Sequence, residues 1–219
     1  MSSRPPLTGM PRLLPYGPTA VLAEYASVDQ VLAVAQRLHT TRLDGVLDGV
    51  IDVVPAARTV LVTYGADVDI GLLHRLLVEP VDVVADPATA HPPGRHTVIE
   101  VVYDGCDLEA VADARGLSVD EVVELHCGVV YTAAFCGFMP GFAYLTGLDP
   151  RLTMPRRDVP RARVPAGSVA IADNFSAVYP AVSPGGWNLL GHTDAVMWDE
   201  AKATPALVVP GSTVRFVPR

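Results

Sequence analysis

An arginine-rich stretch in the second half of the chain carries the clearest chemical signal in the sequence. Five arginines lie within 13 residues: Arg151, Arg156, Arg157, Arg161 and Arg163. Prolines at positions 150, 155, 160 and 165 alternate with them and restrict the backbone. A preorganised group of guanidiniums is suited to binding a carboxylate, a phosphate or an acidic partner. The alternative is a solvated loop in which Asp149 and Asp158 pair with the arginines.

A second candidate site is the segment Ser183-Pro184-Gly185-Gly186-Trp187. Its two glycines let the backbone approach a ligand closely, and successive N–H groups could form an anion-binding nest. An ordinary tight turn followed by a buried tryptophan explains the pattern equally well. His126, Tyr131 and Ser168 are further polar candidates, although a single histidine at a helix end is more often a cap or a core contact.

The sequence contains no complete active site of a familiar kind. No nucleophile elbow, phosphate-binding loop, dinucleotide fingerprint or carboxylate dyad is present. No zinc-ligand spacing occurs, so we expect no metal site. The net charge of −8 disfavours nucleic acid and anionic membranes as partners. Residues 107–127 resemble a helix-turn-helix, but six acidic residues against one arginine exclude its entry into a DNA groove.

The cysteines and the apolar pattern indicate a cytoplasmic protein. Cys106, Cys127 and Cys136 are three in number and form no C-x-x-C pair, which is typical of reduced thiols. We find no basic-then-apolar leader and no apolar run as long as a membrane-spanning helix needs.

The elements that must position these residues predict two domains of the α+β class. Residues 1–90 show the β-α-β-β-α-β order of a ferredoxin-like domain, with strands at 20–25, 50–54, 59–64 and 81–85 and helix caps at Ser27 and Asp67. Residues 86–96 are a predicted linker. Residues 91–219 contain many short apolar runs between Gly and Pro clusters, which predicts a β-barrel. Residues 137–167 are predicted to be a long functional loop with little regular structure.

The sequence resembles the family of the 5-oxoprolinase B subunit, which is also called the KipI family or allophanate hydrolase subunit 1. The likeness covers nearly the whole chain, and its specific motifs lie in the second half. The resemblance begins with His126, Tyr131 and the motif Gly137-Phe138-x-Pro140-Gly141-Phe142-x-Tyr144-Leu145. It continues through 147–152, 155–161, Val164-Pro165-Ala166-Gly167-Ser168-Val169, Tyr179-Pro180, 183–187 and Gly191-x-Thr193. The run Asp173 to Ala177 and His192 depart from the family pattern, which leaves the exact substrate open.

This resemblance implies a cyclophilin-like β-barrel in the second domain and a role as one part of an ATP-dependent, multi-subunit enzyme. In the family, the B subunit works with a C subunit of related fold and an A subunit to convert 5-oxo-L-proline to L-glutamate. ATP with Mg²⁺ is then a requirement of the complex, with none firmly bound by this chain alone. Phosphate transfer to the lactam oxygen would create a better electrophile, and such a step needs nearby positive charge.

The implied site combines the residues of both candidate segments with the family motif. The expected catalytic residues are Arg156, Arg157, Arg161 and His126. The expected substrate-binding residues are Tyr131, Phe138, Pro140, Ser168, Tyr179, Ser183, Gly185, Gly186 and Trp187. Two other functions fit the same family: half of the carboxyltransferase of a urea carboxylase, and a KipI-like inhibitor of a sensor histidine kinase.

Overall fold

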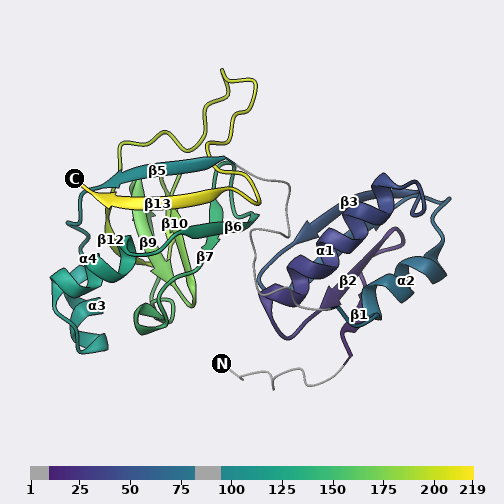
Figure 1. The fold of residues 1–219 in the computed structure, drawn as a ribbon, viewed down its shortest axis with the longest axis horizontal. Coiled ribbons are helices and arrows are strands. Elements are labelled where there is room, and N and C mark those ends of the chain that lie inside the picture. Colours follow the sequence, from purple (N-terminus) through teal and green to yellow (C-terminus); the bar gives the residue numbers. More distant parts are fainter. Residues whose placement is uncertain (1–9, 82–94) are drawn as a thin grey trace. The chain divides into compact units, whose positions relative to one another are not determined.

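The structure, a computed structural model, describes residues 10–81 and 95–219 (Figure 1). The chain divides into two compact units, Met1–His91 and Pro92–Arg219. The predicted domain boundary at residue 90 and most of the predicted linker lie outside the described residues. Both units mix helices and strands, so the predicted α+β class is confirmed. No helix of the described residues is both long and apolar enough to cross a lipid bilayer.

The first unit is an antiparallel sheet with two helices on one face (Figure 1). Its elements are β1 (Arg12–Pro15), β2 (Ala20–Glu24), α1 (Val28–Leu43), β3 (Val50–Pro55), β4 (Thr59–Tyr64) and α2 (Ile70–Val78). The sheet order is β1-β2-β4-β3. Ser27 caps α1 as predicted, whereas α2 is capped by Asp69 rather than Asp67. Strand β1 is an addition to the predicted elements, and the predicted strand 81–85 lies outside the described residues except for Val81.

The second unit is built around a seven-stranded, nearly closed barrel. Its elements are β5 (His96–Val101), α3 (Leu108–Arg115), α4 (Val119–Cys127), β6 (Tyr131–Cys136), β7 (Ala143–Thr146), η2 (Pro150–Leu152), β8 (Arg161–Val164), β9 (Ser168–Ala172), β10 (Phe175–Val178), β11 (Ser183–Gly185), β12 (Asn188–His192) and β13 (Thr213–Pro218). The sheet order is β12-β9-β10-β7-β6-β13-β5. Two backbone hydrogen bonds between Val102 and His192, each 2.9 Å, link the two ends of this order.

The interior of the barrel is apolar, and the helices α3 and α4 contribute to it. Ile99, Val111, Val122, Leu145 and Phe216 are all at most 2 % exposed. Residues 137–167 are more regular than predicted, because β7, η2 and β8 lie within them. Two of the short apolar runs expected to be strands, 195–198 and 207–209, do not form strands, although Trp198 and Ala206 make an isolated bridge. The closure of the barrel therefore does not involve these two segments and is made by the pairing of Val102 with His192.

Gly191 offers a test of the closure of the barrel. A Cβ atom at this position would overlap the backbone oxygen of Val102. We expect Gly191→Ala to lower the free energy of unfolding by about 1–3 kcal/mol, because the strands would have to move apart. Urea unfolding measures this. Gly137→Ala is the control, since its Cβ would meet the ring of Tyr144 at an ordinary 3.9 Å. Equal unfolding midpoints for the two variants would contradict the expectation.

Candidate functional site

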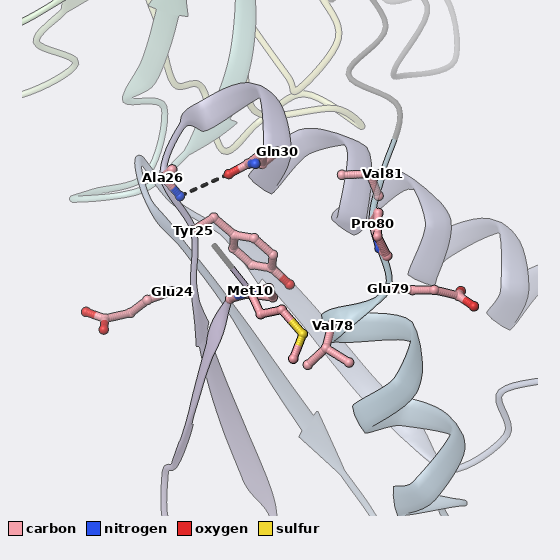
Figure 2. A pocket seen from close by; sticks show the side chains of 10 residues that line it. Met10, Glu24, Tyr25, Ala26, Gln30, Val78, Glu79, Pro80 and Val81 are labelled. Atoms are coloured by element: carbon pink, nitrogen blue, oxygen red, sulfur yellow. Dashed lines mark hydrogen bonds between the residues drawn. The ribbon is translucent and has the colours of Figure 1, made fainter. Parts of the chain in front are cut away.

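A hollow in the first unit is an unsuitable candidate for the functional site. It measures about 350 Å³, and its wall includes Met10 and Val81, which border the undescribed residues (Figure 2). Polar groups in its wall already make hydrogen bonds within the unit. The hydroxyl of Tyr25 donates to the carbonyl of Leu77, and the side chain of Gln30 accepts from the N–H of Ala26. The predicted functional residues all lie in the second unit.

A buried carboxylate, Asp107, holds two of the predicted arginines. Arg157 Nη1 and Arg161 Nη2 each donate to Asp107 Oδ1 at 2.7 Å. The other oxygen, Oδ2, accepts from the backbone N–H of Leu189 at 2.8 Å. Asp107 is 3 % exposed and directly precedes α3. Neither Arg157 nor Arg161 is therefore a freely solvated side chain.

Asp107 is ionised despite its burial. Burial alone would raise the pKa of this carboxyl. The hydrogen bonds from Arg161 and from the Leu189 N–H, together with the charges of Arg161 and Arg157, outweigh it and hold the pKa of Asp107 below its ordinary value. The positive end of α3 also favours a negative charge at this position.

The arginine segment and the Ser183–Trp187 segment lie side by side. Strands β8 and β11 form a two-stranded ribbon, the β8–β11 ribbon, with Arg161 opposite Gly185. Just outside it, the N–H of Arg157 donates to the carbonyl of Gly186 at 2.7 Å. Two segments that are separate candidates in the sequence thus form one structure.

A small pocket of about 70 Å³ opens next to the ribbon. It is lined by Phe138, Phe142, Tyr144, Arg156, Tyr179, Pro184, Gly185, Gly186 and Trp187. The wall is mainly aromatic. The Arg156 guanidinium lies 5.9 Å from the centre of the Trp187 ring, within range of a cation–π contact, and 4.0 Å from a carboxylate oxygen of Asp173. A pocket with these walls can bind a small ligand that has one apolar face and one negative group.

Tyr179 supplies a buried hydroxyl at this pocket. Its position explains Gly185, because a Cβ atom at residue 185 would overlap the Tyr179 hydroxyl oxygen. Burial raises the pKa of Tyr179, although the Trp187 N–H and the charges of Arg156 and Arg161 act in the opposite direction. The hydroxyl is therefore protonated and can serve as a hydrogen-bond donor.

Phe138 forms a strained rim of the pocket. Its φ angle is +72°, a conformation that costs energy for a bulky residue, yet its side chain is 60 % exposed. The ring meets Phe142 edge-on at a centroid distance of 5.3 Å. Pro140, in the same turn, is exposed but does not line the pocket. An exposed aromatic ring held in a strained conformation is typical of a contact surface.

Three predicted site residues lie in the barrel and do not line the pocket. His126 is fully buried; its Nδ1 lies 2.7 Å from the Tyr103 hydroxyl and its Nε2 lies 2.9 Å from Ser176 Oγ. Tyr131 donates to the carbonyl of His126, and Ser168 donates to the carbonyl of Pro165. None of the surface of His126 is accessible in this structure, so it does not reach the pocket, and its expected catalytic role stays a prediction.

Asp107, which binds two of the predicted arginines, is not recognisable as a site residue from the sequence. In the sequence it is one of six acidic residues in 107–127, and its position suggests nothing beyond a helix start. Its three partners are 50, 54 and 82 residues away, so no local pattern identifies them. Within the described ranges, no three His, Cys, Asp or Glu side chains gather as a metal site requires.

The sequence matches a described protein family over residues 11–208, the "Carboxyltransferase domain, subdomain C and D". Three curated proteins, each named as the B subunit of 5-oxoprolinase, come from Escherichia coli O157:H7, Haemophilus influenzae and Bacillus subtilis. They are 50%, 42% and 42% identical to this chain over 131, 127 and 113 residues. The match to the Escherichia protein covers 58% of this chain and 60% of that protein.

Solved structures agree with this match. The crystal structure of TTHA0988 superposes with a TM-score of 0.72 and 34% identity, over 91% of this chain and 40% of that one. The Kluyveromyces lactis urea carboxylase gives a TM-score of 0.69 at 17% identity, over 100% of this chain and 22% of that one, which is a likeness of fold.

The chain therefore belongs to the carboxyltransferase C and D subdomain family. Within it, the resemblance to the 5-oxoprolinase B subunit predicted from the sequence is confirmed.

His126 predicts a pH dependence of stability. Burial lowers its pKa from 6.5 to about 3 in the folded chain. The unfolded chain binds a proton below about pH 6.5 that the folded chain excludes, so stability falls as the pH drops from 6.5 towards 3. We expect His126→Gln to reduce this loss, measured by urea unfolding at pH 7.0 and pH 5.0. A difference between the two pH values that is the same in wild type and variant would contradict the assignment.

Proposed function

We propose that this chain is the B subunit of a cytoplasmic, ATP-dependent 5-oxoprolinase, which converts 5-oxo-L-proline to L-glutamate. The observation that carries the proposal is the aromatic pocket bordered by Arg156, next to the β8–β11 ribbon with Arg161. A five-membered lactam with one carboxylate has the apolar face and the negative group that this pocket suits. The names of the relatives in the family support the same substrate.

The pocket supports the idea of an incomplete site that partner subunits complete. Pockets that enclose a small ligand usually measure about 300–1,000 Å³. The aromatic pocket beside the ribbon measures about 70 Å³ and is too small to hold a nucleotide. We therefore place ATP elsewhere in the complex, on the A or the C subunit. The exposed ring of Phe138 would then be covered by a partner, which is the C subunit in our proposal.

In this proposal the chain contributes binding and positive charge. A lactam is a resonance-stabilised amide, and its opening requires activation, for which ATP supplies the free energy. Negative charge develops on the lactam oxygen as the ring opens, and a nearby guanidinium stabilises it. Arg156 is the guanidinium at the pocket. Tyr179 provides a protonated hydroxyl beside it.

The carboxyltransferase half of a urea carboxylase is the second candidate function. The observation in its favour is the fold likeness to the Kluyveromyces lactis urea carboxylase. A kinase-inhibitor role has no comparable observation in its favour.

The proposal is tested by omitting one protein of the complex at a time. We expect glutamate formation from 5-oxo-L-proline and ATP when this chain is combined with candidate A and C subunits, and none when this chain is left out. A complex that assembles but forms no glutamate would contradict the proposal. Combining this chain and the candidate C subunit with a biotin carboxylase, its biotin carrier, ATP, bicarbonate and urea would then test the second function.

A variant at the pocket tests the role of Arg156. We expect Arg156→Ala to lower kcat/KM of the assembled complex by about tenfold or more, because a charge at the reacting group is lost. Arg151→Ala is the control, since Arg151 pairs with Asp149 at 2.9 Å and does not line the pocket. If both variants kept the activity of the wild type, Arg156 would have no part in the reaction.

A further inference from the structure

The turn between β9 and β10 places a carboxylate beside the aromatic pocket. Asp173 and Asn174 form this two-residue turn, and they begin the segment that departs from the family pattern. The φ angle of Asp173 is +52°, a left-handed conformation that aspartate, asparagine and glycine adopt more readily than other residues. Its carboxylate lies 4.0 Å from Nε of Arg156, the one charged residue among the described residues that line the pocket. The departing segment therefore meets the charged group of the pocket.

Hydrogen bonds hold the backbone on both sides of Arg156. Met154 exchanges two backbone hydrogen bonds with Asp173, one in each direction. On the other side, the N–H of Arg157 donates to the carbonyl of Gly186 at 2.7 Å. The backbone therefore keeps Asp173 close to Arg156, although both side chains are more than half exposed and their ion pair alone would be weak.

The two terminal nitrogens of Arg156 are available to a ligand. Asp173 lies at Nε, and within the described ranges neither Nη1 nor Nη2 has a hydrogen-bond or ion-pair partner. The guanidinium lies 5.9 Å from the centre of the Trp187 ring. Two terminal nitrogens form a fork that binds one carboxylate. A carboxylate bound there shares the charge of Arg156 with Asp173.

The charges beside the pocket suit a ligand with one negative charge. The ion pairs of this region join three guanidiniums to two carboxylates, those of Arg156, Arg157 and Arg161 to those of Asp107 and Asp173. Arg163 and Asp158, both exposed in the same segment, add one charge of each sign. One positive charge is left over. A single carboxylate neutralises it, whereas a second carboxylate adds an unbalanced negative charge near Asp173.

We propose that Asp173 is a specificity-determining residue, which restricts the pocket to ligands with a single negative charge. Asp173 leaves the fork of Arg156 open to one carboxylate and repels a second. The inference rests on the proposed function, because it takes the aromatic pocket as the substrate site. 5-Oxo-L-proline has one carboxylate and meets this condition, whereas glutarate, an open-chain diacid with the same number of carbon atoms, does not.

The test measures binding to the full chain without partner subunits. The probes are 5-oxo-L-proline and glutarate, each followed by the NMR signal of the indole N–H of Trp187 in the pocket wall. We expect Asp173→Asn to lower the ratio of the glutarate Kd to the 5-oxo-L-proline Kd by about threefold or more, because the charge that repels the second carboxylate is lost. Asparagine tolerates the φ angle of +52°, so the turn is kept.

Matched variants separate the charge of Asp173 from its place in the turn. Asp173→Gly removes the same charge and also permits a positive φ angle, so it should change the ratio as Asp173→Asn does. Asp194→Asn is the control, since Asp194 pairs with Arg219 and does not line the pocket, and it should leave the ratio unchanged.

High salt distinguishes repulsion from a change in structure. In about 1 M NaCl the screening length is about 3 Å, so the difference between Asp173→Asn and the wild type should disappear. A difference that persists in this salt would overturn the proposal. It is also overturned if the ratio is the same in the wild type and both Asp173 variants, as for an aspartate that only positions Arg156, or if neither probe shifts the Trp187 signal.

The assembled complex separates this inference from the proposed function. If the complex forms glutamate, glutarate should inhibit Asp173→Asn about threefold more strongly than wild type, relative to the KM for 5-oxo-L-proline. If the complex forms none and the Kd ratio of the chain still changes as expected, the proposed function fails and the charge selectivity stands. An active complex with the same ratio in wild type and variant would overturn the selectivity alone.

Discussion

The side chain of Asp107 joins three segments that are far apart in the sequence. It precedes helix α3, binds Arg157 and Arg161 of the arginine segment, and accepts a hydrogen bond from the N–H of Leu189 in β12. Burying a carboxylate removes its hydration, and the cost is offset only when opposite charges and hydrogen bonds replace the water. Here the two guanidiniums and the backbone N–H replace it. The position of the β8–β11 ribbon against the barrel, and with it one wall of the pocket, depends on this carboxylate.

Two buried ionisable side chains of the second unit differ in charge state: His126 is neutral and Asp107 is ionised. Burial lowers the pKa of His126 to about 3, so the ring is neutral and stacks on Phe216 at 4.7 Å. Asp107 remains charged because two guanidiniums lie within hydrogen-bonding distance. The neutral ring belongs to the barrel interior, whereas the charged carboxylate anchors the arginine segment beside the barrel.

The sequence predicts the features that depend on neighbouring residues. The cap of α1 is one of them, with Ser27 Oγ accepting a hydrogen bond from the N–H of Gln30. The arginine segment and the Ser183–Trp187 segment are each recognisable from composition. Their pairing is not, because β8 and β11 are too short and too polar to show the alternation of a strand. Asp107 could not be predicted, since its partners are set by the closed barrel.

The pairing of β13 with β5 has a consequence for folding of the protein during its synthesis on the ribosome. The two strands run parallel, from Thr213 beside His96 to Pro218 beside Val101, although more than a hundred residues separate them. Strand β5 cannot obtain this neighbour until β13 has left the exit tunnel. During synthesis the edges of both β5 and β6 that β13 will cover therefore stay unpaired, a state in which strand edges attract other chains. A chaperone that shields β5 in that interval would protect the nascent barrel.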